Sequence, residues 1–264
     1  MANDMTIITH RFDEPIIIYP IADVHLGAVE HNAKAWEAVC KEILDQPNAY
    51  VILDGDLLDN ATRSSIGDIW AATMNPMEAR IKMCEQLAPI RERILCIVSG
   101  NHEMRTTKDS SEDESLLIAT KLNLEEYYRQ NTAFLTLRFG KRNGDTNFGK
   151  PIVSYTICVT HGSGGTLTAA ANKSVSYGNV IDNLDILIVG HSHKGFVIRP
   201  SKLVIDMHNN KVTQRDYVVV SAVSWMEYGG YAMRKMLTPS SNSKPQKIYL
   251  GMPPSREKDI QVIW

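Results

Sequence analysis

The chain has 264 residues, with 28 Lys and Arg residues against 30 Asp and Glu residues, so its net charge is −2. Hydrophobic residues make up 44% of the chain and charged residues 22%, proportions that fit a globular fold and exclude a disordered, coiled-coil or collagen-like chain. The balanced charge also argues against a protein whose whole surface binds nucleic acid or membrane, while a local patch stays compatible with a nucleic-acid substrate.

Apolar runs alternate with amphipathic stretches over the first two-thirds of the chain, which predicts β-strands joined by crossover helices. The first helix is expected to end at Leu44, with Asn32 as its N-cap. A second helix is expected to carry Met77, Ile81, Met83, Cys84 and Leu87 on roughly one side, as the apolar face of an amphipathic helix. This second helix is predicted over Pro76–Leu87. In chain order the remaining predicted elements are the strand Ile16–Ala22, the strand Tyr50–Leu53, the strand Ile94–Val98, the exposed loop Met104–Ser115 and the short helix Leu116–Leu122.

The second half of the chain is richer in strand patterns. Phe134–Phe139 and Ile152–Val159 predict a hairpin around the turn-rich stretch Gly140–Lys150, and Ile186–Val189 is the next buried strand. Beyond Gly190, four short strands favour a second, more antiparallel sheet: Phe196–Ile198, Leu203–Met207, Tyr217–Ser221 and Lys247–Leu250. Because no clear linker divides the chain, residues 1–264 are expected to form a single domain.

The N-terminus and the cysteines bear on the location of the protein. Asp4 stands where a signal peptide carries positive charge, and no apolar run approaches the ~18 residues of a membrane span. A cytoplasmic protein without membrane contact is therefore expected. The four cysteines lie far apart and form no Cys-x-x-Cys pair, so neither disulfides nor a zinc knuckle is expected.

Chemically versatile side chains follow five of the predicted strands, and five of the eight histidines fall among them. Because the ends of parallel strands converge on one edge of a sheet, these groups are expected to meet in one pocket. The five motifs are Asp23-Val24-His25, Gly55-Asp56-Leu57-Leu58-Asp59-Asn60, Gly100-Asn101-His102-Glu103, Thr160-His161-Gly162 and Gly190-His191-Ser192-His193.

The motifs offer two Asp, one Asn and four His as metal ligands, a set of nitrogen and oxygen donors without thiolate. Such donors suit Mn²⁺, Fe or Zn²⁺ better than Ca²⁺. Seven ligands are more than one tetrahedral zinc requires, so a pair of ions roughly 3.5–4 Å apart, bridged by a carboxylate, accounts for the set. Two ions indicate a phosphate ester as substrate, whereas a single-iron enzyme that uses dioxygen needs only three facial ligands.

In this order, the motifs resemble those of the calcineurin-like metallophosphoesterase superfamily, and they span residues 23–193. The resemblance implies an α/β fold, a four-layer αββα sandwich of two mixed β-sheets flanked by helices. It also implies a hydrolase that depends on two divalent metal ions, Mn²⁺ foremost, with Fe, Zn²⁺, Ni²⁺ or Mg²⁺ as alternatives.

The same resemblance implies a role for each motif residue. The first metal is held by Asp23, His25 and His193, the second by Asn101, His161 and His191, and Asp56 bridges the two. A hydroxide that bridges the ions then attacks phosphorus. His102 is the general acid that protonates the leaving oxygen, and Asp59 orients it.

The substrate class is predicted from a closer likeness. Asp23-Val24-His25-Leu26-Gly27 and Gly55-Asp56-Leu57-Leu58-Asp59 resemble SbcD-type DNA-repair nucleases, which predicts a phosphodiesterase or nuclease acting on nucleic acid or nucleotides. Little of the chain remains for the DNA-binding extensions of those nucleases, so a stand-alone enzyme is expected. Glu103 departs from that branch, where Asp is usual, and favours a phosphomonoesterase as the alternative. A non-catalytic binding module on the same scaffold is a further alternative, against which the complete ligand set argues.

Four residues are candidate substrate contacts: Asn60, Gly162, Ser163 and Arg234. Backbone N–H groups of the Gly-rich stretch after His161 are suited to cradle phosphate, although such turns also serve backbone geometry alone. Arg234 lies in an aromatic and cationic stretch that begins at Trp225. That stretch fits a hydrophobic hairpin with a solvated basic end better than a base-stacking surface.

Overall fold

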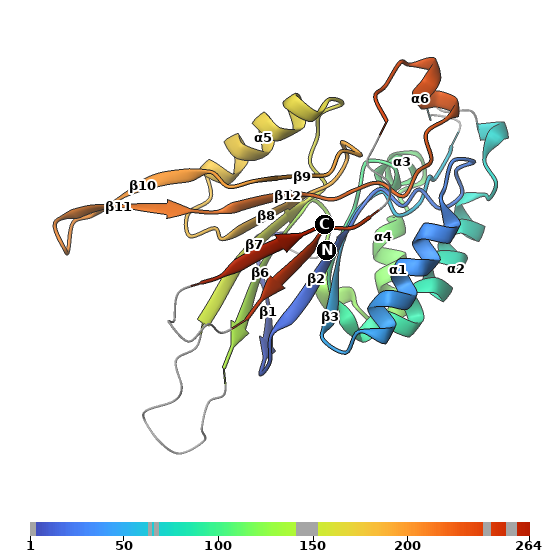
Figure 1. Ribbon diagram of the computed structural model, residues 1–264. Coiled ribbons are helices and arrows are strands. Elements are labelled where there is room, and N and C mark those ends of the chain that lie inside the picture. Colours follow the sequence, from blue (N-terminus) through green and yellow to red (C-terminus); the bar gives the residue numbers. More distant parts are fainter. Residues whose placement is uncertain (1–3, 63–64, 66–68, 141–152, 240–243, 252–257) are drawn as a thin grey trace.

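The computed structural model describes residues 4–62, 65, 69–140, 153–239, 244–251 and 258–264. Two six-stranded β-sheets pack face to face, and helices cover the outer face of each, so the fold has four layers in the order α/β/β/α (Figure 1). This arrangement confirms the αββα sandwich of two mixed sheets that the sequence motifs imply.

The first sheet contains the parallel strands of the N-terminal half. In spatial order its strands are β14 (Ile260–Ile263), β13 (Lys247–Leu250), β2 (Ile16–Ile21), β3 (Ala49–Asp54), β4 (Ile94–Val98) and β5 (Tyr128–Arg129). Strands β2 to β5 run parallel, while β13 is antiparallel to both of its neighbours. All six residues of β2 are buried, as expected for a strand covered on both faces.

The second sheet joins strands from both halves of the chain. In spatial order these are β1 (Ile7–Phe12), β6 (Thr132–Phe139), β7 (Val153–Thr160), β8 (Ile186–Val189), β12 (Val218–Ser221) and β9 (Phe196–Ile198). Strands β7, β8 and β12 run parallel, whereas β6 and β9 are antiparallel to their partners β7 and β12. The four short strands predicted beyond Gly190 do not form one antiparallel sheet of their own. Only β10, which overlaps the predicted strand Leu203–Met207, lies in a separate antiparallel pair, whereas β9 and β12 join the second sheet and β13 joins the first.

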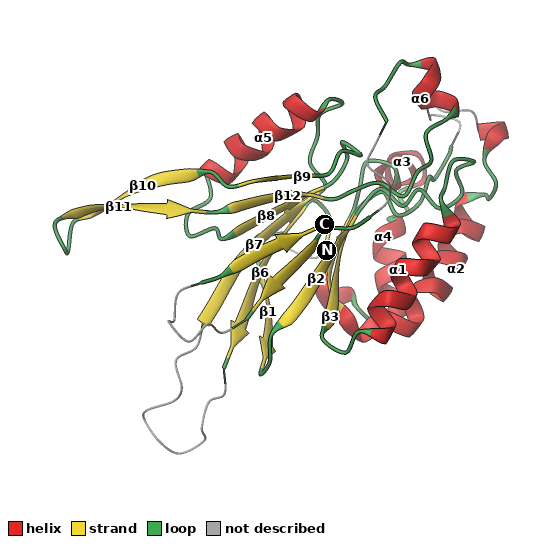
Figure 2. Ribbon diagram, in the orientation of Figure 1, coloured by secondary structure: helices red, strands yellow, loops and turns green. Residues whose placement is uncertain are grey.

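Helices and a projecting ribbon complete the described chain (Figure 2). The helices are α1 (Ala33–Asp45), α2 (Pro76–Leu87), α3 (Glu103–Ser110), α4 (Glu114–Leu122), α5 (Leu167–Asn179) and α6 (Gly230–Arg234), with 3-10 turns at Ile69–Ala71, Ala88–Arg93 and Glu125–Tyr127. The antiparallel strands β10 (Ser201–Asp206) and β11 (Lys211–Asp216) form the ribbon. No described helix combines the length and the apolar character needed to cross a bilayer.

Three layers of apolar side chains hold the sandwich together. Ile18 and Ile52 of the first sheet belong to one buried cluster with Leu135 and Ile157 of the second. A second cluster joins the first sheet to α1, α2 and α4, and a third joins the second sheet to α5. Asn32 caps α1 as predicted, since its Oδ1 accepts the N–H of Ala35 at 3.0 Å.

Two local predictions are wrong. Residues 104–110, predicted as loop, belong to α3, whose buried residues are the polar Glu103 and Thr106, so no apolar periodicity marks this helix. Helix α2 begins and ends as predicted, yet Met77 and Ile81 are exposed and Ala79 is buried in their place. The predicted strand start at Ile152 and the turn beyond Gly140 lie outside the described residues. All four cysteines are free thiols, as expected.

Candidate metal centre

The five motifs follow the carboxyl ends of β2, β3, β4, β7 and β8. The first three are parallel neighbours in the first sheet, and the last two are parallel neighbours in the second. The two sheets meet here, because the Trp225 N–H, beyond β12, donates to the Asp23 carbonyl at 3.0 Å. Side chains that are up to 170 residues apart in sequence therefore share one site.

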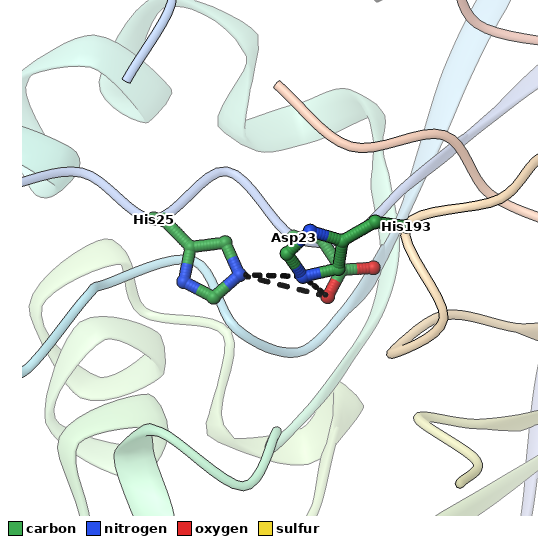
Figure 3. A group of neighbouring side chains, drawn as sticks. All are labelled: Asp23, His25 and His193. Carbon is green, nitrogen blue, oxygen red and sulfur yellow. Dashed lines mark hydrogen bonds and ion pairs between the residues drawn. The ribbon is translucent and has the colours of Figure 1, made fainter. Parts of the chain in front are cut away.

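One group of donors consists of Asp23, His25 and His193, and their side chains converge in Figure 3. Nε2 of His25 lies 3.1 Å from Nε2 of His193. Oδ1 of Asp23 lies 3.7 Å from the first of these nitrogens and 3.3 Å from the second. This is the set that the sequence predicts for the first metal.

A second group consists of Asp56, His161 and His191. Oδ2 of Asp56 lies 3.1 Å from Nε2 of His161. Nδ1 of His191 lies 2.6 Å from Oδ1 of Asn101, which adds the amide predicted as a ligand. Oδ2 of Asp56 also lies 3.9 Å from Nε2 of His25, so its carboxylate stands between the two groups.

Backbone N–H groups orient both carboxylates. The N–H of His191 donates to Oδ2 of Asp23 at 2.9 Å, and the N–H of His102 donates to Oδ1 of Asp56 at 2.8 Å. In each carboxylate the other oxygen faces the histidines. Oδ1 of Asp23 and Nε2 of His161 are buried without a hydrogen bond in the described chain. Buried polar atoms are seldom left without a partner, so these atoms fit residues that bind metal ions.

The tautomer of His161 follows from a neighbouring backbone group. Its Nδ1 lies 2.6 Å from the carbonyl oxygen of Asp54 and donates to it, which leaves Nε2 available to bind a metal ion. The Asp54 carboxyl is buried, and no described residue forms a hydrogen bond with it. Burial and the nearby charges of Asp23 and Asp56 raise its pKa well above the usual range.

Opposite charges set the protonation of the donor groups. Burial opposes ionisation of Asp23 and Asp56, but His193 beside the first and His161 beside the second hold both pKa values below the usual range. Burial lowers the pKa of His25, yet the close carboxylates of Asp23 and Asp59, 3.7 and 3.8 Å from its ring nitrogens, and the charge of Asp56 raise it to about 10. Near neutral pH these carboxylates are therefore charged, and His25 carries a proton that a metal ion would displace.

The backbone of the site is unusual. Five candidate ligands, which are Asp23, His25, Asp56, His191 and His193, have positive φ angles between 50° and 66°. Residues other than Gly, Asn and Asp seldom adopt this left-handed conformation, so the three histidines are the unusual members of the set, and such residues cluster at functional sites. Gly100 is required for a steric reason, because a Cβ at this position would lie only 2.1 Å from Oδ1 of Asp56.

His102 lies next to both donor groups. Its Nδ1 donates to the carbonyl oxygen of Asp59 at 2.7 Å, while the Asp59 carboxylate lies 3.5 Å away. The backbone of Asp59, more than its carboxylate, thus orients the His102 ring. Nε2 of His102 then faces Asp56 and lies 3.8 Å from its Oδ2. The guanidinium of Arg105 lies beside His102, with nitrogens 3.1 and 3.0 Å from Nδ1 and Nε2. Arg105 was not singled out from the sequence, and only its spacing of three residues from His102 on a helix marks it.

Glu103 braces the loops that carry the ligands. Its buried carboxylate accepts the backbone N–H groups of Asp56, Leu58 and Gly100 at 3.0, 2.9 and 2.9 Å. Glu103 therefore supports the turn that contains His102 and ties it to the loop after β3.

We expect Glu103→Ala to lower the free energy of unfolding by at least about 3 kcal/mol, because three buried N–H groups lose their acceptor at ~1–3 kcal/mol each. Urea unfolding of the EDTA-treated protein measures the change without any contribution from bound metal. The exposed Glu92 supplies the control Glu92→Ala, for which a change within about 0.5 kcal/mol is expected. Equal losses in the two variants would contradict the bracing role.

The structure separates the four candidate substrate contacts. Asn60 is buried, and its side-chain N–H groups donate to the His102 carbonyl and to Oγ1 of Thr106. Gly162 and Ser163 are exposed directly after His161. Arg234 is exposed at the end of α6. The hairpin expected around Arg234 is wrong, because a helix forms there and Trp225 packs in the core against Trp36.

The sequence model of the calcineurin-like phosphoesterase family matches residues 18–195, a range that contains all seven candidate ligands and His102. The chain belongs to this family. Membership supports a metal-dependent phosphoester hydrolase, and the calcineurin-like phosphoesterases typically use two metal ions, for which the clustered His and Asp residues are the candidate ligands.

Two solved structures are similar to this calcineurin-like phosphoesterase. The calcineurin-like phosphoesterase YfkN from Bacillus subtilis is 12% identical with a TM-score of 0.42, and 94% of this chain and 90% of that chain are covered. Vps29 from Chaetomium thermophilum is 12% identical with a TM-score of 0.38, and 94% of each chain is covered. No curated protein sequence matches the chain at a significant level.

Proposed function

We propose that this calcineurin-like phosphoesterase hydrolyses phosphodiesters of nucleic acids or nucleotides with two divalent metal ions, Mn²⁺ foremost. The observation that carries the proposal is the position of the Asp56 carboxylate between His25 of one donor group and His161 of the other. A carboxylate shared by two groups is the arrangement that a pair of ions requires. When bound, the pair supplies Lewis acidity for the phosphoryl oxygens and a nucleophile from water near neutral pH.

The chain's own residues supply the proton and the positive charge. His102 donates a proton from Nε2 to the leaving oxygen, because its Nδ1 is engaged with the Asp59 carbonyl. Arg105 beside it holds a phosphoryl oxygen of the substrate, since a guanidinium matches the geometry of a phosphate. Proton donation suits an alkyl ester, such as the linkage of a nucleic-acid backbone, because the alkoxide that leaves is strongly basic.

Glu103 bears on the choice between diester and monoester. It is the residue that departs from the SbcD-type pattern, and in the sequence it favoured a phosphomonoesterase. In the structure its carboxylate is buried and binds three backbone N–H groups, so the departure concerns a support of the loops rather than a contact with substrate. The likeness of the other motifs to phosphodiesterases supports the diester.

The test is hydrolysis of an aryl phosphodiester and the matching aryl phosphomonoester by the Mn²⁺-loaded protein, with Asp56→Asn as the blank. Faster turnover of the diester is expected and leads to assays on single-stranded and duplex DNA. Faster turnover of the monoester overturns the substrate class and favours a phosphatase. Absence of turnover with both esters, after subtraction of the blank, overturns the proposed hydrolase.

We expect metal binding to release protons. The pKa of His25 is raised to about 10, and Asp56 raises that of His161 well above its usual range despite burial, so both rings carry protons near pH 7 that a metal displaces. Calorimetric titration of the EDTA-treated protein with Mn²⁺, in buffers of different ionisation enthalpy, is expected to show about two protons released at pH 7. The affinity for Mn²⁺ should rise as pH rises toward 10. The same heat in all buffers would contradict the prediction, and His161→Gln should remove part of the release.

A further inference from the structure

The ribbon of β10 and β11 carries an apolar face that nothing in the described chain covers. The ribbon continues β9 and β12 outward, away from the body of the molecule and on the side opposite α1 and α2 (Figure 1). Leu203 and Ile205 are 76% and 75% exposed, and Val212, which stands opposite Ile205, is 61% exposed. These three side chains lie on the same face, because alternate residues of a strand point to the same side.

The outer edge of β10 is open in the described chain. Its six residues pair with β11 alone, and β10 follows β9, which is itself the edge strand of the second sheet. An exposed, apolar edge is a template for pairing with another strand. The strand that this edge fits best is a second copy of itself.

The sequence of β10 is self-complementary around Val204. When two copies run antiparallel about a two-fold axis through Val204, Leu203 stands opposite the partner's Ile205, and Lys202 stands opposite the partner's Asp206. Symmetry repeats each pair, so the joined edges gain apolar contacts on one face and two pairs of opposite charge on the other. Cross-strand pairs of both kinds stabilise antiparallel sheets.

Other symmetric pairings fit less well. An axis moved to Leu203 sets the Lys202 side chain against Val204 and leaves the charge without a partner. The outer edge of β11, paired with itself, sets Lys211 against Arg215, and these like charges repel. The charges thus select both the strand and the register.

We propose that two copies of the chain associate through β10, in antiparallel register about Val204, so that their ribbons form one four-stranded sheet. Lys202 uses one of its three N–H groups for the carbonyl of Ile181, and Asp206 accepts from Asn209, so both charged groups retain hydrogen-bonding capacity for the partner. The association does not depend on the proposed hydrolytic activity.

The test measures the mass of the full chain by sedimentation velocity over a range of concentrations. The wild type is expected to reach twice 29.6 kDa at high concentration, and Ile205→Glu to stay at 29.6 kDa. In Lys202→Glu the new carboxylate of each copy stands opposite Asp206 of the other copy. The like charges repel at both ends of the pairing, so this variant should also be a monomer. The double variant Lys202→Glu with Asp206→Lys exchanges the charges and should restore the dimer.

Met77→Glu is the matched control, because Met77 is an exposed apolar residue on α2, far from the ribbon, and the mass of this variant should equal that of the wild type. Circular dichroism should show the spectrum of the wild type for each variant, which checks that the variants are folded. A wild type that stays monomeric at all concentrations overturns the proposal. A dimer that survives Ile205→Glu overturns the use of β10, and failure of the double variant to restore the dimer overturns the register.

Discussion

We expect Asp56→Asn to lower turnover by on the order of 10³-fold, because a metal pair supplies several kcal/mol of transition-state stabilisation and a tenfold change in rate corresponds to about 1.4 kcal/mol. The substitution removes the charge that the two donor groups share. It preserves the fold, because Oδ1 of the amide still accepts the N–H of His102.

Two measurements check this expectation. Elemental analysis after loading with Mn²⁺ should give fewer bound ions in Asp56→Asn than in the wild type, and turnover of the aryl phosphodiester should fall in parallel. Asp45→Asn makes the same chemical change at an exposed position at the end of α1 and should leave both values unchanged. Full metal content together with normal turnover in Asp56→Asn would show that Asp56 does not bridge.

For His102→Ala we expect a loss that depends on the leaving group. An alkoxide is strongly basic and requires a proton as it leaves, so turnover of an alkyl diester should fall by roughly 10²–10⁴-fold, the usual contribution of general acid catalysis. An aryl leaving group with a low pKa departs without that proton, so its turnover should change little. The measurement compares wild type and variant on a series of diesters that differ in the pKa of the leaving group.

The metal content of His102→Ala separates two roles. Nε2 of His102 lies 3.8 Å from Oδ2 of Asp56, and with His25 these residues form a third group of possible ligands. A variant that still binds two ions supports the general acid, whereas loss of an ion would make His102 a ligand. His208→Ala, at an exposed position, is the control and should change neither metal content nor turnover.

The sequence predicts the sandwich well where burial follows a simple period. Strands such as β2 are apolar throughout because both faces are covered, and α1 has an amphipathic pattern with a cap at Asn32. The short helix α3 lacks that signal, since the residues it buries are polar. The pairing of β9, β12 and β13 with two different sheets is a tertiary choice that local patterns do not encode.

The candidate site was predicted to the extent that its residues directly follow strands. The position of Asp56 between two donor groups could be expected from the family motifs, and the structure places it there. The placement of Arg105 beside His102 depends on the unrecognised helix α3, and so escaped prediction. The burial of Asn60 depends on its contact with Thr106, 46 residues away, and long-range contacts of this kind leave no local pattern.

The left-handed backbone at five of the candidate ligands has an evolutionary consequence. A glycine at any of these positions removes a candidate ligand, and at the three histidine positions it also relieves conformational strain of about 1–2 kcal/mol. Selection for a robust fold and selection for hydrolysis therefore act in opposite directions on the same codons. In a lineage that is no longer selected for hydrolysis, substitutions would accumulate that give a more stable but inactive protein. The first of these would be glycines in place of the candidate histidine ligands after β2 and β8.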